Sequence, residues 1–125
     1  MVVDLGAFQC RFGTAGQDLP RYNFSSFSSA PYDTPSSISV GDHSLRLVRE
    51  RQLVNPIFHG PEINWDAVEQ VMKYGIVDQM RLNPENYAVM LSQGKYFRSP
   101  EAQKKVRLTA TSHHVFLSHL TLFFA

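Results

Sequence analysis

The sequence is short of cysteine, of net charge and of long apolar runs, and each shortage excludes a class of protein. A single cysteine among 125 residues forms no internal disulfide and supplies no thiolate metal cluster. Lys and Arg number 12 against 11 for Asp and Glu, which argues against a chain whose main role is gripping nucleic acid or an anionic membrane. No apolar run approaches the roughly 18 residues that a membrane-spanning helix needs.

The residues that are present have the composition of one globular domain. Hydrophobic residues make up 43% and charged residues 18%, which is too apolar for a disordered chain. A chain of this length buries a single core. Asp4 stands where a secretion signal carries basic and then apolar residues, so we expect a reducing compartment, either nucleus or cytosol.

The first segment predicts a β-hairpin. Phe8, Cys10 and Phe12 alternate with polar residues, which is the period-two pattern of a strand. The small residues before them predict a tight turn, and residues 13–16 predict a second bend. Because Cys10 shares a strand face with the two phenylalanines, we expect a packed core cysteine rather than an activated thiolate.

The middle of the chain is poorer in regular patterns. Residues 25–39 hold seven serines and two prolines, a composition that predicts a loop. Leu45, Leu47 and Val48 alternate loosely and predict a short strand. Prolines and a glycine over residues 56–61 then interrupt the chain again.

The clearest helix begins after Asn64, which is a favourable N-cap residue. Asp66 adds negative charge in the first turn, where the helix dipole favours it. Gly75 inside the helix costs about 1 kcal/mol relative to alanine. Large apolar residues recur at spacings of three and four and form one stripe, which fits the core better than a ligand box. These residues are Trp65, Val68, Met72, Ile76 and Met80.

The remaining segments complete a mixed α/β pattern. Residues 87–92 form an apolar run with the length of a buried strand, and Ser99-Pro100 is typical of a helix start. The order strand, hairpin, loop, helix, strand, helix predicts a mixed α/β chain. From about Val106 the sequence becomes an apolar tail, which would be prone to aggregation unless something covers it.

Candidate chemistry concentrates at the N-terminal hairpin. Asp4 has the chemistry to hold a hydrated Mg²⁺ through water, and the turn amides from Gly6 to Phe8 suit phosphate oxygens. Arg11 would neutralise phosphate charge. On spacing alone, an ordinary hairpin with a surface arginine is the commoner meaning of this pattern, so both interpretations stay open.

Other clusters carry weaker signals. The basic residues within 46–51 and within 104–107 are expected to be solvated, with a nucleic-acid or partner contact as the minority alternative. Three histidines within 113–119 have no carboxylate or cysteine nearby to complete a metal shell. No group of residues supplies a nucleophile, a base and an oxyanion hole together.

The run from Val3 to Arg21 resembles the opening of the actin family. That family begins with an Asp-x-Gly phosphate loop, continues with a basic residue and then has an Ala-Gly-x-Asp-x-Pro-Arg turn. This chain has Asp4-Leu5-Gly6, then Arg11, then Ala15-Gly16-Gln17-Asp18-Leu19-Pro20-Arg21. Further similar segments follow in the family's order at residues 40–42, 55–69 and 84–92.

The resemblance implies a partial actin-like ATPase fold, with the N-terminal subdomains only and a mixed sheet with flanking helices. Residues 1–105 would form this partial domain, with a shortened flexible-loop insertion at about 25–39. Residues 106–125 would form a divergent apolar tail. In the full-length relative, ATP and Mg²⁺ would be the cofactors. By this resemblance the phosphate-binding residues are Asp4, Gly6, Ala7, Phe8 and Arg11, with Asp4 also reaching the metal through water.

Three residues depart from the actin pattern. Ala7 replaces a serine hydroxyl, Phe8 replaces a glycine, and Arg11 replaces a lysine while keeping its charge. The family's second phosphate loop and adenine pocket have no counterpart in these residues. Because positioning and electrostatics supply most of the rate of phosphoryl transfer, we expect no ATP hydrolysis by this chain.

These departures resemble nuclear actin-related proteins of chromatin-remodelling complexes more than conventional actin. The expected role is a non-catalytic scaffold subunit in the nucleus, which binds a helical segment of a remodelling ATPase and other actin-like subunits. Direct contact with nucleic acid or membrane is not expected. Two alternatives remain: a cytoskeletal actin-like ATP-binding protein, and a truncated isoform without independent function.

Overall fold

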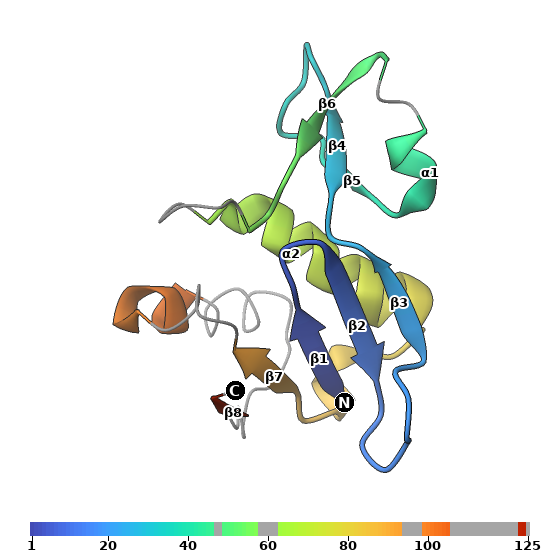
Figure 1. The fold of residues 1–125 in the computed structure, drawn as a ribbon, viewed down its shortest axis with the longest axis vertical. Coiled ribbons are helices and arrows are strands. Elements are labelled where there is room, and N and C mark those ends of the chain that lie inside the picture. Colours follow the sequence, from blue (N-terminus) through green and yellow to red (C-terminus); the bar gives the residue numbers. More distant parts are fainter. Residues whose placement is uncertain (47–48, 58–62, 94–98, 106–122, 125) are drawn as a thin grey trace.

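The computed structural model describes residues 1–46, 49–57, 63–93, 99–105 and 123–124. These residues form two sheets, a larger one crossed by the longest helix and a smaller one beyond it (Figure 1). The predicted mixed α/β fold is confirmed. Of the helices described, none combines the length and apolar character needed to cross a bilayer.

The larger sheet has the strand order β3-β2-β1-β7-β8. Neighbours in the hairpin and its extension are antiparallel, whereas β7 runs parallel to both β1 and β8. The centre of the sheet is therefore β1. Its strands are β1 (Val2–Leu5), β2 (Gln9–Gly13), β3 (Tyr22–Ser25), β7 (Met90–Gln93) and β8 (Phe123–Phe124).

The predicted hairpin is confirmed as the pair β1–β2. Its turn is closed by the Gly6 N–H, which donates to the Gln9 carbonyl at 3.1 Å. A Cβ at Gly6 would lie 2.5 Å from that same oxygen, so the tightness of the turn requires glycine. The second bend is also present, with Gly16 at a φ of 90°.

Cys10 lies beneath this turn and is 1% exposed, which confirms the predicted core cysteine. Its sulfur is 3.1 Å from the hydroxyl of the buried Ser26. That hydroxyl donates its own hydrogen to the Gly6 carbonyl at 2.6 Å, so the thiol is the donor to Ser26. Burial is the main cause that raises the pKa of Cys10 to about 11.

The prediction of a loop over residues 25–39 is wrong for its first half. Residues 28–31 form β4 (Ser28–Pro31), the central strand of the smaller sheet, whose order is β5-β4-β6. The outer strands are β5 (Ser39–Val40) and β6 (Arg51–Val54). Serine suits this strand because its small side chain lets α1 pack closely against β4. Ser29 Oγ donates a hydrogen bond to the Ser44 carbonyl at 2.9 Å.

Two further predictions about this region need correction. The segment expected to be a strand near Leu45 begins instead as the short helix α1 (Asp42–Leu45), and residues 47–48 lie outside the described residues. Arg51 is not simply solvated. Its guanidinium donates to Ser29 Oγ at 2.9 Å, to the Ser29 carbonyl at 3.0 Å and to Ser39 Oγ at 2.9 Å, and so ties the three strands together.

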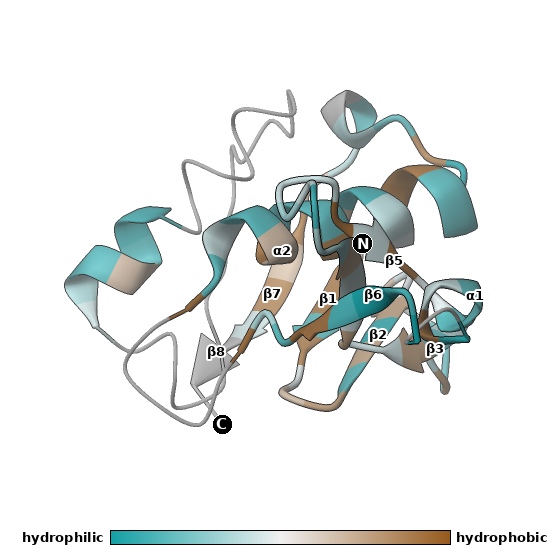
Figure 2. Ribbon diagram, turned by 90° about the horizontal axis from the view of Figure 1, so that it is seen from above, coloured by the Kyte–Doolittle hydropathy of each residue, from teal (hydrophilic) through white to brown (hydrophobic). Residues whose placement is uncertain are grey.

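The predicted long helix is present as α2 (Trp65–Lys73), and Asn64 Oδ1 accepts from the Ala67 N–H at 3.0 Å as its cap. Figure 2 shows α2 lying along one face of β1 and β7, with apolar segments on these elements. The buried stripe members are Val68, Met72, Ile76 and Met80, and Trp65 packs at their edge.

The continuation of α2 is a π-helix, η1 (Tyr74–Gln79), which the periodicity did not predict. The packing of this helix against the sheet explains why residue 75 is a glycine. A Cβ on Gly75 would overlap the ring of Phe12, which is fully buried in the sheet. The glycine is therefore a contact surface for the sheet as well as a weak helix former.

The later elements match their predictions in part. The strand expected at residues 87–92 is β7, which starts only at Met90 after a 3-10 turn η2 (Pro84–Asn86). Ser99 caps a helix over 100–105, because its Oγ accepts from the Ala102 N–H at 3.1 Å. Of the apolar tail, only the two residues of β8 are described, and they extend the larger sheet.

We expect Gly75→Ala to destabilise the fold by about 2 kcal/mol, because the added methyl would overlap the ring of Phe12, which is fully buried. The free energy of unfolding from urea titrations tests this. Val77→Ala is the control, since Val77 lies in the same π-helix and is 42% exposed. Equal stability of the two variants would contradict the close helix–sheet contact.

The raised pKa of Cys10 predicts a loss of stability in alkali. Below the ordinary thiol pKa of 9.0 both states keep the proton, so stability is complete there. As the pH rises from about 9 to about 11 the unfolded thiol ionises first, and up to about 3 kcal/mol is lost. Urea titrations at pH 8 and 10.5 should show a steeper decline for the natural chain than for Cys10→Ala; parallel declines would refute it.

Candidate functional site

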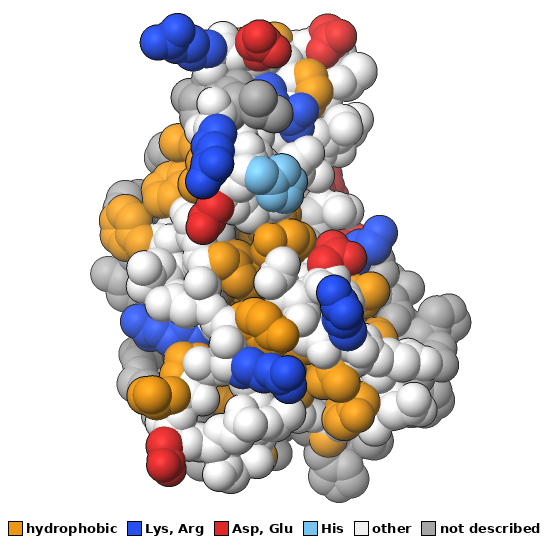
Figure 3. Space-filling model, turned by 90° about the vertical axis from the view of Figure 1, so that its right-hand side faces the viewer, with side chains coloured by type: hydrophobic (Ala, Val, Ile, Leu, Met, Phe, Trp, Pro, Cys, Tyr) orange, Lys and Arg blue, Asp and Glu red, His pale blue; other side chains and the backbone are white. Residues whose placement is uncertain are grey.

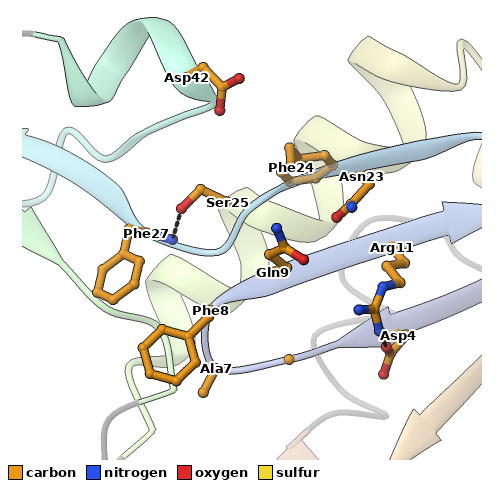
Figure 4. A pocket seen from close by; sticks show the side chains of 11 residues that line it. Asp4, Ala7, Phe8, Gln9, Arg11, Asn23, Phe24, Ser25, Phe27 and Asp42 are labelled. Atoms are coloured by element: carbon orange, nitrogen blue, oxygen red, sulfur yellow. Dashed lines mark hydrogen bonds and ion pairs between the residues drawn. The ribbon is translucent and has the colours of Figure 1, made fainter.

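An open pocket of about 630 Å³ lies beside the hairpin turn (Figure 4). Its lining comes from β1, β2, β3, the connection to β4, and the start of α1. The structure brings together in this pocket all five residues predicted to bind phosphate: Asp4, Gly6, Ala7, Phe8 and Arg11.

Strand register places the two charged members opposite each other. Asp4 pairs with Arg11 across the antiparallel hairpin, so both side chains leave the same face of the sheet. Arg11 Nη1 lies 3.0 Å from Asp4 Oδ2. Both side chains are substantially exposed, so this ion pair contributes at most about 1 kcal/mol.

The other carboxylate oxygen of Asp4 is also engaged. Parallel pairing of β1 with β7 sets Ser92 beside Asp4, and the Ser92 hydroxyl donates to Asp4 Oδ1. Each oxygen of this carboxylate therefore has a donor from a neighbouring strand. The side chain predicted to hold a hydrated metal is held in place by Arg11 and Ser92.

The backbone of the turn is tied down from one side. Besides the Gly6 N–H bond to Gln9, the Phe8 carbonyl accepts from the Ser26 N–H at 3.0 Å, and the Gly6 carbonyl accepts from the Ser26 hydroxyl. The Gly6 amide, one of those predicted to point at phosphate, thus donates within the turn itself. Ser26 therefore holds the turn through two hydrogen bonds, one from its backbone N–H and one from its hydroxyl.

Phe8 stands at the tip of the turn with Ala7 (Figure 4). Its side chain is 58% exposed and its ring lies 6.0 Å from that of Phe27, centroid to centroid, at an interplanar angle of 49°. This is a tilted aromatic pair within the favourable range. Where the resemblance would place a glycine, the pocket instead has an aromatic rim.

The sequence did not identify the opposite wall of the pocket. Asp42 begins α1 and faces the hairpin from across the space, and Asn23 and Phe27 line the pocket from β3 and from the residues after it (Figure 4). No sequence signal links Asp42 to Asp4, because their place in one pocket depends on how the smaller sheet follows β3. The charged lining residues are Asp4, Arg11 and Asp42, so the pocket has a formal charge of −1.

A second hollow of about 270 Å³ lies where β5 and α1 meet α2 and η1. It is lined by both charge signs, with Lys73 and Asp78 facing it together with His43 and Tyr74. Figure 3 shows basic and acidic side chains scattered over this side of the molecule around an apolar band. That face therefore presents no continuous basic surface of the kind that nucleic-acid binding favours.

Metal ligands do not gather in the part of the chain that is described, where no group of three His, Cys, Asp or Glu side chains lies close enough to hold an ion. The histidines within 113–119 lie outside the described residues. The basic cluster at 104–107 is described only to Lys105, whose ammonium lies 5.7 Å from the centre of the Trp65 ring.

Known proteins share this sequence pattern. Residues 1–118 match the actin family. Actin-like protein 7B of Rattus norvegicus is 28% identical over 129 residues, which cover 97% of this chain and 31% of the relative. Actin-like protein 7B of Homo sapiens is 29% identical over 128 residues, with the same coverage.

Actin-like protein 7A of Homo sapiens is 32% identical over 99 residues, which cover 74% of this chain and 23% of the relative. The chain thus spans about a third or less of the length of these relatives. The mixed sheet flanked by helices fits a part of the actin-like fold, and the match extends over most of the residues. By sequence and by fold, this chain belongs to the actin family.

Proposed function

We propose that this chain is a non-catalytic, protein-binding actin-related protein, a scaffold subunit of a nuclear chromatin-remodelling complex. The proposal that the chain is non-catalytic rests on the side chains of the predicted phosphate loop. Asp4 is engaged through both oxygens, and the bulky Phe8 stands at the tip of the turn. The resemblance of residues 7–11 and of the shortened loop to nuclear relatives supports the nuclear part.

The fit of ATP and Mg²⁺ to this loop is poor, although the actin-like fold generally binds them. A triphosphate carries several negative charges, and the pocket that would receive it is formally −1. Ala7 offers no hydroxyl to a terminal phosphate, and Phe8 hinders close approach of phosphate to the backbone. The loop therefore keeps Asp4, Gly6 and Arg11 but lacks the hydroxyl and the open backbone that a terminal phosphate would use.

Protein binding is supported by the surface. Several large apolar side chains remain exposed among the described residues, and exposed aromatic residues are favoured at protein interfaces. Those most exposed are Leu19, Tyr32, Phe8 and Leu53. The partners proposed for this surface are a helical segment of a remodelling ATPase and other actin-like subunits, with no direct nucleic acid and no membrane among them.

The alternative is a cytoskeletal actin-like protein that binds ATP. One observation favours it: Asp4, Gly6 and Arg11 still converge on a single pocket. The ion pair between Asp4 and Arg11 is exposed and weak, so a strongly bound nucleotide could displace it. Nucleotide binding therefore separates the two proposals.

Restoring the family's residues tests the state of the loop. We expect the double variant Ala7→Ser, Phe8→Gly to bind Mg-ATP at least about fivefold more tightly than the natural chain, because it regains one hydroxyl and open access to the backbone. Calorimetric titration of the purified chain measures this. The matched control is Ala15→Ser, Tyr32→Gly, which makes comparable changes, a small residue to serine and an aromatic one to glycine, at exposed positions outside the pocket.

The natural chain should also show no ATP turnover above that of a buffer blank. Turnover by the natural chain, or Mg-ATP binding by the natural chain as tight as that of the double variant, would contradict a non-catalytic role and favour the cytoskeletal alternative.

Location and partners are tested in cells that express the protein. We expect the tagged protein to fractionate with nuclei and to co-purify with a remodelling ATPase, and a deletion of that ATPase's helical segment should abolish the association. Sedimentation with actin filaments is the opposing readout. Recovery with filaments and exclusion from nuclei would refute the nuclear proposal.

A further inference from the structure

We propose that the pocket beside the hairpin receives a basic side chain from an apolar and basic peptide segment of a protein partner. This inference rests on the proposed protein-binding function and specifies which surface of this chain performs it. The surface consists of an aromatic rim on one side and a carboxylate on the other (Figure 4).

The aromatic rim is formed by Phe8 and Phe27. Their ring centroids lie 6.0 Å apart, and 58% of Phe8 is exposed to solvent. Exposed aromatic rings attract arginine and lysine through the negative charge of their faces, and also cover the aliphatic stem of those side chains. Phosphate gains nothing from such a surface.

The carboxylate is that of Asp42. It is exposed at the start of α1, and it has no hydrogen bond or ion pair with any residue that the structure describes. Asp4 and Arg11 compensate each other at the other end of the pocket. The uncompensated charge of the pocket is therefore negative and belongs to Asp42, which favours a cationic partner group.

The volume and the remaining lining agree with a peptide. About 630 Å³ exceeds what one side chain fills, and lies within the range of sites that bind small ligands or several side chains. Gln9 and Asn23 supply amides that can both donate to and accept from a peptide backbone. A short segment with alternating basic and apolar residues satisfies each of these features.

The test uses three probes on the purified ¹⁵N-labelled chain. The first is the peptide acetyl-Arg-Leu-Arg-Leu-amide, the second has glutamate in place of both arginines, and the third is magnesium tripolyphosphate. We expect the arginine peptide alone to shift the backbone amides of residues 7–11, Asn23 and Asp42. Shifts spread over unrelated surfaces, or stronger pocket shifts with tripolyphosphate, would overturn the proposal.

Substitutions at Phe8 and Asp42 measure how much the aromatic rim and the carboxylate each contribute to peptide binding. Phe8→Ala should weaken arginine-peptide binding about fivefold and Asp42→Asn about threefold, the effects typical of exposed cation–π and ion pairs. Tyr32→Ala and Asp18→Asn are the matched controls, since both residues are exposed and lie outside the pocket. Dispersion of the amide spectrum establishes that each variant is folded. Affinities equal to the natural chain in both pocket variants would overturn the proposal.

Failure of this inference differs visibly from failure of the proposed function. If Phe8→Ala and Asp42→Asn still co-purify with the protein partner as the natural chain does, the pocket is not the docking surface while the scaffold role stands. If the natural chain turns over ATP or fails to co-purify with the proposed complex, the function itself is wrong, whatever the peptide does.

Discussion

The pairing of β1 with strands on both of its sides is the constraint on which the site depends. Antiparallel pairing with β2 sets Arg11 against Asp4, and parallel pairing with β7 sets Ser92 against the same carboxylate. One residue thus takes its two partners from segments seven and eighty-eight positions away. A slip of one residue in either pairing would turn these side chains to the opposite face and dissolve the arrangement.

Support for the turn comes from beneath the sheet. Ser26 joins the Cys10 thiol, the Gly6 carbonyl and the Phe8 carbonyl, and so links the loop to the start of the smaller sheet. Arg51 plays a comparable part within that smaller sheet, where it bonds to serines of two other strands. The apolar core also contributes to the position of this region, since Val40, two residues before Asp42, is buried in the main hydrophobic cluster.

Actin-family membership and the local departures from its pattern point in different directions, and the geometry accounts for both. Gly6 is required because a Cβ at this position would lie 2.5 Å from the Gln9 carbonyl oxygen. Ala7 and Phe8 already carry a Cβ within the turn, and neither has a positive φ. Their side chains can therefore change without loss of the turn.

The sequence by itself determined the hairpin, the buried Cys10 and the long helix with its Asn64 cap, because each depends on periodicity or on chemistry between near neighbours. It could not determine that the serines of β4 are buried, that Gly75 contacts Phe12, or that Asp42 and Asp4 line the same pocket. Those facts arise from contacts between segments that are distant in the sequence, and neither composition nor local periodicity reports such contacts. Strand order and the approach of α2 to the sheet decided them, because only the folded chain fixes which distant surfaces meet.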